Sequence, residues 1–312
     1  MRRLPGTAAL ALLAASLSVC TPAQETIPLA FKFSAGEVTS YDVALAGSGA
    51  FLAPDGKRAA VGIQGALTFV QTVREVLADG SGRVETVLPK ADITVTFDTE
   101  RVRFSYADGK LRWFANGKES SPPQVDFAKV PLLGSPVVCT IAPDGRVTDL
   151  GPADPQALGE LARSLPQLSF SGTPGLDEPV FPPAPVRIGE TWRTAAQLTP
   201  FGAALPLAVT ASRTLQSFEE AGGIGLAKIV GFAEARYRGG GARVVSAEGV
   251  SVTISDIRQT LTSTEFFNAT AGRLVRGDYA LALNTTLSAQ AGGEDKGEAG
   301  VEARLRVTLQ AR

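Results

Sequence analysis

Histidine, cysteine and paired carboxylates carry most protein catalysis and metal binding, and this sequence uses few of them. Of its 312 residues two are cysteine and none is histidine. The lack of histidine excludes Ser-His-Asp and Cys-His nucleophilic systems, histidine-ligated zinc and the commonest general base. Cys139 follows Val137 and Val138, a setting typical of a small buried hydrophobic residue. The alternative for Cys139 is a reactive or intermolecular thiol.

Carboxylates leave one kind of catalysis open. A carboxylate pair for glycoside hydrolysis meets in space rather than in sequence, so such a hydrolase stays an alternative. The acidic residues nonetheless alternate along expected strands or lie in turns, as on a solvated face. Asp79-Gly80-Ser81-Gly82 and Glu294-Asp295-Lys296-Gly297-Glu298 carry oxygen ligands, but neither matches a calcium loop. We therefore predict that the protein is not an enzyme, with no catalytic, cofactor-binding or metal-binding residues and no cofactor.

The amino terminus predicts export. Two arginines precede an apolar run from Ala8 to Val19 that is too short to cross a bilayer of about 30 Å. Cleavage after Ala23 removes residues 1–23 as a signal peptide and leaves a soluble protein. Alternatively, Leu17-Ser18-Val19-Cys20 loosely resembles a bacterial lipoprotein signal, and lipidation of Cys20 anchors the chain. Either route gives a periplasmic or extracellular protein, and no later segment predicts a transmembrane helix.

Composition narrows the class further. The 30 basic and 31 acidic residues nearly balance, which argues against a nucleic-acid partner because such proteins need a basic patch. Apolar residues make up 44% of the chain, enough to exclude a disordered protein. An unknown envelope protein or a lipid remains as the expected partner.

Period-two alternation is the clearest structural pattern of the mature chain. Val301, Ala303, Leu305, Val307 and Leu309 alternate with charged or polar neighbours, as in half-buried strands. Similar alternation covers residues 93–97, 102–106, 250–254 and 279–287. Asp-Gly pairs between apolar runs mark tight turns at 55–56, 79–80, 108–109 and 144–145. The predicted fold is all-β, mainly an antiparallel meander.

A proline-rich segment interrupts this pattern. Thirteen of the 20 prolines lie between Pro122 and Pro185, and proline removes a ladder donor. Within the segment, Asp154 and Pro155 form a helix start. Apolar residues at helical spacing follow and predict one short amphipathic helix, which serves either for packing against a sheet or as a lid: Leu158, Leu161, Leu165 and Leu168.

The two flanks of this segment look related. Gly36-Glu37 opens the first flank and Gly189-Glu190 the second, and Gly145-Arg146-Val147 matches Gly272-Arg273-Leu274 in the same order. An internal duplication, with two related β units, is therefore expected. The predicted organisation is a signal peptide at 1–23, a first β unit at 24–150, a connector at 151–185 and a second β unit at 186–312.

These features resemble a family of exported bacterial β-rich proteins with no assigned function. The resemblance rests on the Gly-Glu strand opening, the Asp-Gly-Arg-Val turn, the proline-rich run and the segment Pro185–Trp192. It carries no catalytic residues. More loosely, curved antiparallel sheets with a helix laid across them resemble LolA-type periplasmic carriers, an architectural likeness that does not fix function.

The sequence leaves three functions open. We expect a non-enzymatic cell-envelope protein with a structural or interaction role, which uses sheet faces and edges to contact partners. One alternative is a periplasmic carrier whose concave sheet holds a lipid or another hydrophobic ligand. The other is an outer-membrane-associated β-protein, against which stand the few interfacial aromatics and the absence of a carboxyl-terminal aromatic residue.

Overall fold

A computed structural model describes residues 26–53, 55–120, 136–152, 180–198, 207–245, 250–291 and 294–312. In these residues the regular structure is β-strand, which confirms the all-β antiparallel prediction. None of them forms a helix with the length and apolarity needed to span a bilayer. The predicted signal peptide, Cys20 and the helix with its four leucines lie outside the described residues.

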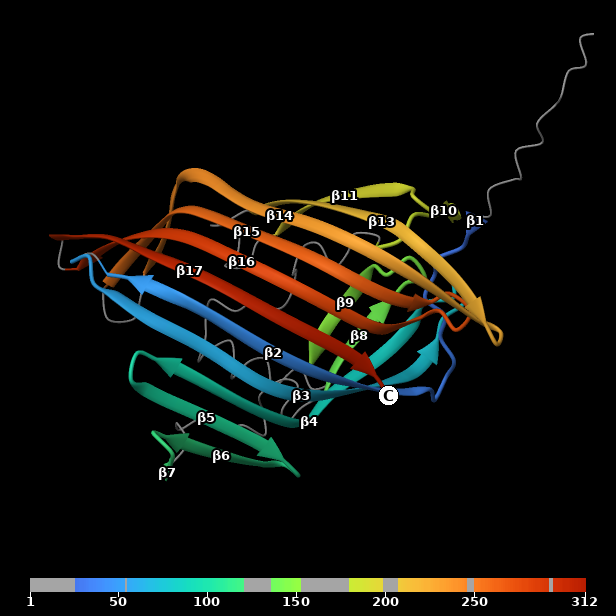
Figure 1. Cartoon of the computed structure of the whole chain (residues 1–312), viewed down its shortest axis with the longest axis horizontal. Helices are drawn as coiled ribbons and strands as arrows, with labels where there is room; N and C mark the ends of the chain where they lie inside the picture. Colours follow the sequence, from blue (N-terminus) through green and yellow to red (C-terminus); the bar gives the residue numbers. More distant parts are fainter. Residues whose placement is uncertain are drawn as a thin grey trace, which may run out of the picture.

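Fourteen strands form one sheet, and two short strands form a separate pair (Figure 1). Along the path of the large sheet the order is β11-β13-β14-β15-β16-β17-β2-β3-β4-β5-β6-β7, with β8 on β4 and β9 on β8. Every pairing is antiparallel. The strands of the amino-terminal half are β2 (Val38–Leu52), β3 (Arg58–Val76), β4 (Gly82–Phe97), β5 (Glu100–Ala107), β6 (Lys110–Ala115), β7 (Lys118–Ser120), β8 (Val137–Ile141) and β9 (Val147–Pro152). Those of the second half are β11 (Thr191–Leu198), β13 (Leu207–Ala221), β14 (Ile224–Val245), β15 (Val250–Asn268), β16 (Arg273–Ala291) and β17 (Glu294–Ala311), and the separate pair is β1 (Thr26–Ile27) with β10 (Val186–Arg187).

The expected Asp-Gly turns join the strands. Gly56, Gly80, Gly109 and Gly145 all have positive φ, between 72° and 87°, a region that glycine enters at little cost. In the turn between β3 and β4, the Asp79 carboxylate accepts a hydrogen bond of 2.9 Å from the Ser81 amide. This segment is thus a structural turn, as the sequence predicted for it.

The two halves of the chain share one sheet, because β17 pairs with β2 from Gly300↔Leu52 to Ala311↔Tyr41. Their matching sequences also make matching hydrogen bonds. In the first half, the Gly36 amide donates to the Val73 carbonyl (2.8 Å) and the Val73 amide donates to the Glu37 carbonyl (2.9 Å). The second half makes the same two bonds at 2.7 and 3.1 Å, with Gly189, Leu215 and Glu190 in the same places.

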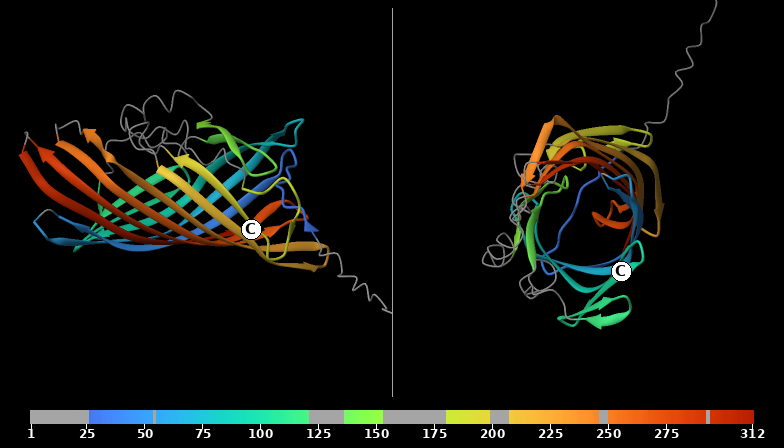
Figure 2. Two further views of the ribbon diagram at one scale, coloured as in Figure 1. Left: turned by 90° about the horizontal axis from the view of Figure 1, so that it is seen from above. Right: turned by 90° about the vertical axis from the view of Figure 1, so that its left-hand side faces the viewer.

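The large sheet is rolled, and its strands form a nearly complete ring in the end-on view (Figure 2). The segment before β2 crosses one end of this roll. Phe31 packs on Phe267 of β15, while Phe33 packs beside Val73 of β3. Two extended residues span only about 7 Å, whereas β15 and β3 are four strand spacings, about 19 Å, apart along the sheet. The segment can contact both strands only as a chord across the concave side.

Cross-strand pairing then assigns each residue to a face. Residues in register with Phe267 and Val73 point to the concave side, and their sequence neighbours point to the convex side. In β17 the concave residues are Val301, Ala303, Leu305, Val307 and Leu309, all half-buried, and the intervening charged and polar residues are exposed. The sheet is therefore apolar inside and charged outside.

Ion pairs between neighbouring strands cover the convex face. Arg112 and Glu119 approach to 2.9 Å, and Arg258 and Glu234 to 3.0 Å. Arg103 pairs in the same way with Asp92. Exposed pairs of this kind contribute little to stability individually, but they keep the outer surface hydrated.

Candidate functional site: a polar cluster on the concave face

The concave face has long apolar rows. One cross-strand row contains, from β15 through β3, Leu261, Leu281, Leu305, Gly47 and Ile63. A Cβ on Gly47 would lie 2.9 Å from Ile63 and 3.1 Å from Leu305. Glycine is therefore needed at this point to let large neighbours close over the curved backbone.

Aromatic residues close one end of the concave face. Phe31, Phe181 and Phe267 pack with ring centroids 4.8 to 5.4 Å apart, two of the three pairs edge-on. Trp192 is buried in the same cluster, and its indole nitrogen donates to the Val180 carbonyl at 2.9 Å. Such aromatic packing adds stability beyond that of the buried area.

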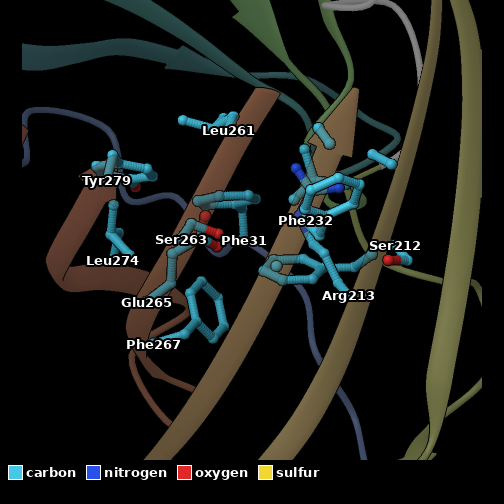
Figure 3. Close-up of a pocket in the computed structure, with 15 residues that line it drawn as sticks. Phe31, Ser212, Arg213, Phe232, Leu261, Ser263, Glu265, Phe267, Leu274 and Tyr279 are labelled. Atoms are coloured by element: carbon cyan, nitrogen blue, oxygen red, sulfur yellow. The ribbon is translucent and has the colours of Figure 1, made fainter. Parts of the chain in front are cut away.

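A polar cluster interrupts the apolar face beside this aromatic end. Arg213 of β13, Gly231 of β14, Ser263 of β15 and Tyr279 of β16 lie in one cross-strand row. Glu265 lies two residues further toward the aromatic end. Figure 3 shows these side chains around a pocket that they share with Phe31 and Leu261, with a cavity volume of about 310 Å³.

Two glycines make room for this cluster. A Cβ on Gly231 would lie 2.4 Å from the Ser263 hydroxyl oxygen and 3.6 Å from Cγ of Arg213. A Cβ on Gly277 would lie 2.5 Å from the Tyr279 ring, which therefore lies over the bare glycine. Substitution of either glycine would displace a polar side chain of the pocket.

The environment changes the acidity of the cluster. Burial raises the pKa of Glu265, although the nearby charge of Arg213 and a hydrogen bond from Ser263 act in the opposite direction. Burial also raises the pKa of Tyr279, and the Glu265 charge adds to this effect. Tyr279 is thus a neutral hydrogen-bonding group at physiological pH, and Glu265 takes up a proton more readily than an exposed glutamate.

The sequence did not single out this cluster. A signal was present, since Arg213 and Glu265 place a charge in the apolar phase of strands that otherwise alternate regularly. That signal is weak because the alternation does not say which phase is concave. The hypothetical site residues Cys20, Leu158, Leu161, Leu165 and Leu168 lie outside the described residues, so their roles stay predictions.

Cys139 is placed by the structure. It is buried beside Val73 and Val84, which confirms the interpretation as a small hydrophobic residue. Burial raises the pKa of its thiol to about 11, so the thiolate is scarce at neutral pH. In the described residues, His, Cys, Asp and Glu form no group of three or more that would hold a metal ion.

Comparison with known proteins identifies no family: neither a family model nor a curated protein matches the chain. Among solved structures, an outer membrane channel from Pseudomonas putida F1 has a TM-score of 0.24 at 7% identity, covering 90% of this chain and 97% of that one. OccK5 (OpdH) from Pseudomonas aeruginosa has a TM-score of 0.23 at 6% identity, covering 88% and 98%. OpdQ from the same organism has a TM-score of 0.21 at 5% identity, covering 88% and 99%. TM-scores this low do not establish a common fold.

Proposed function

We propose that this protein is a non-enzymatic, exported envelope protein that holds a hydrophobic ligand against the concave face of its sheet. The observation that carries the proposal is the polarity of the two faces, apolar inside and charged outside. A concave apolar surface with a few polar groups is the usual form of a small-molecule site. This was an alternative from the sequence, and the side-chain arrangement favours it over a purely structural role.

The same polarity argues against a sheet that spans the outer membrane. Strands in contact with lipid turn apolar side chains outward, and a charge at mid-membrane costs about 2–4 kcal/mol. Here Arg304 and Arg306 of β17 and Arg103 of β5 point outward from the middle of the roll. Contact with water on the convex face and with a ligand on the concave face accounts for both surfaces.

The non-enzymatic part of the proposal rests on the carboxylates. Glu265 is the carboxylate among the described residues that line the cavity. On the convex face Asp92, Glu119 and Glu234 are held in ion pairs with arginine. Glycoside hydrolysis needs two carboxyl groups that flank one bond, and the described pocket offers one.

Binding of a fluorescent apolar probe to the full exported protein, stripped of lipid, tests the proposal. The probe should bind with a blue-shifted, enhanced emission that an excess of long-chain lipid displaces. Leu305→Gln, in the middle of the concave face, should weaken binding, because it adds a polar group to the apolar row.

Arg306→Gln is the matched control, since it changes the next residue of the same strand on the opposite face. It should leave probe binding unchanged. If both variants bind the probe like the wild type, or if the wild type does not bind it, the proposed function is wrong. Native mass spectrometry of protein purified from its own host is an independent test and should show a co-purifying lipid.

A further inference from the structure

Among the described residues Arg213 forms no ion pair, and Glu265 is the opposite charge that shares its largely apolar pocket. Most convex arginines named above are instead paired with carboxylates. Its side chain is half-buried and lines the cavity beside Phe31 and Phe267. A charge removed from water is costly unless it is paired, so this arrangement calls for an anion supplied from outside.

Tyr279 is a donor suited to the same anion, while the Ser263 hydroxyl already donates to Glu265. Tyr279 and Ser263 each carry a hydroxyl in the cross-strand row of Arg213. An arginine guanidinium presents paired N–H groups that match the two oxygens of a carboxylate. Burial raises the pKa of Glu265, which lessens its competition for the guanidinium.

A matching segment in the first half has similar local structure without this cluster. Leu215 and Val73 occupy the same place in the two halves, as their hydrogen bonds show. Two residues earlier, Arg213 in the second half corresponds to Gln71 in the first. The uncharged half folds into the same local structure, so the charge of Arg213 serves a purpose beyond folding.

The surroundings limit the shape of the ligand. The aromatic cluster of Phe31, Phe181 and Phe267 closes the cavity on one side, which leaves room for a small head group only. On the other side β13 stays apolar on the concave face from Ala211 to Leu207, and the row of Ala211 continues with Ala233, Leu261 and Leu281, while Gln259 lies in the next row. Counted from Arg213 this is six residues, about 20 Å at about 3.4 Å per residue, a length suited to an extended acyl chain.

We propose that Arg213 and Tyr279 form the head-group site for a long-chain carboxylic acid whose chain lies along the apolar rows of the concave face. This inference rests on the proposed function and specifies its ligand. Arg213 binds the carboxylate, and Tyr279 donates a second hydrogen bond. Glu265 lines the same pocket, and its negative charge, when ionised, opposes the positive charge of Arg213.

Palmitate and hexadecanol test the head group, since they share a chain and differ in charge. Calorimetric titration of the lipid-free full chain should show tighter binding of palmitate. Arg213→Gln should weaken palmitate binding by about ten- to a hundredfold, the usual effect of losing a hydrogen bond to a charged group. The same variant should leave hexadecanol binding within about twofold, because an alcohol does not need the cation.

Two variants serve as controls. Arg193→Gln removes an exposed arginine of β11 on the convex face and should change neither affinity. Arg213→Lys keeps the charge and should restore part of the palmitate affinity if Arg213→Gln acts through charge rather than through misfolding. Equal binding of both compounds to the wild type, or palmitate binding unaffected by Arg213→Gln, would overturn the head-group site while leaving the carrier function intact. If neither compound binds, the carrier function itself fails.

Discussion

At the scale of single residues, the concave face tolerates Arg213 and Glu265 because each is only partly removed from water. Their charges act on one another across the pocket, and Ser263 supplies a hydrogen bond to Glu265. Gly231 leaves the space that the neighbouring side chains of Arg213 and Ser263 occupy. Charged residues so placed are seldom kept for stability, since apolar replacements often serve a core equally well.

The raised pKa of Glu265 makes stability depend on pH. A carboxyl whose pKa is raised by folding binds its proton more tightly in the folded state, so its effect on stability is unfavourable above that pKa. As pH falls through the raised pKa toward the ordinary value of 4.5, this penalty disappears. Glu265→Gln should therefore melt at a higher temperature than the wild type at pH 8, and the difference should shrink toward pH 4. A difference in melting temperature that grows as the pH falls would contradict this assignment.

At the scale of elements, the segment before β2 connects regions that are far apart in the sequence. The Phe31 amide donates to the Pro143 carbonyl in the turn between β8 and β9 (2.7 Å). The Lys32 amide donates to the Gly272 carbonyl in the turn between β15 and β16 (3.1 Å). An extended segment of a few residues thus ties both halves of the sheet together at one end.

Removal of the Phe31 ring should loosen this end of the molecule. Phe31→Ala removes contacts to three rings, and Phe-to-Ala substitutions in cores cost about 3–5 kcal/mol. Because Phe31 is only partly buried, we expect about 3 kcal/mol less free energy of unfolding in urea. Phe97→Ala, at a side chain 47% exposed, is the control and should cost less than about 1 kcal/mol. Equal losses in both variants would show that the aromatic end is not a core.

At the scale of the whole molecule, both halves of the chain contribute strands to one rolled sheet. The halves meet through β17 and β2, a pairing that extends over twelve residues of each strand. The division at 151–185, which predicts that the halves also fold as separate units, stays a prediction. Shared hydrogen bonds along that seam couple their stability in either case.

Limited proteolysis tests the relation between the halves. Cleavage is expected first between Pro152, where β9 ends, and Pro185, because the sequence of this segment is rich in proline, which supplies no ladder donor. Since β17 pairs with β2, the two fragments should stay associated and elute together on size exclusion at neutral pH, and should separate only in denaturant. Fragments that separate without denaturant would show that the seam contributes little to stability.

The sequence by itself determined the kind of structure and its local details. Alternation along Val301 to Leu309 defined a strand with one apolar and one charged face, and the Asp-Gly pairs defined the turns. The Gly-Glu pairs that begin at Gly36 and Gly189 marked two similar segments, and the structure shows the same backbone hydrogen bonds in both. These features are local, because a side-chain period and a positive φ depend on neighbours within a few residues.

The tertiary structure alone decided which face of the sheet is concave and which side chains lie together on that face. Alternation is the same whether the apolar face is concave or convex, so the sequence could not separate a carrier from a sheet that faces lipid. The crossing of Phe31 and Phe33 from β15 to β3 settles the direction. Strand pairing from β13 to β16 brings Arg213, Ser263 and Tyr279 into one row, although 66 positions separate the first from the last in the chain. Strand register and sheet curvature, both products of long-range pairing, create the site.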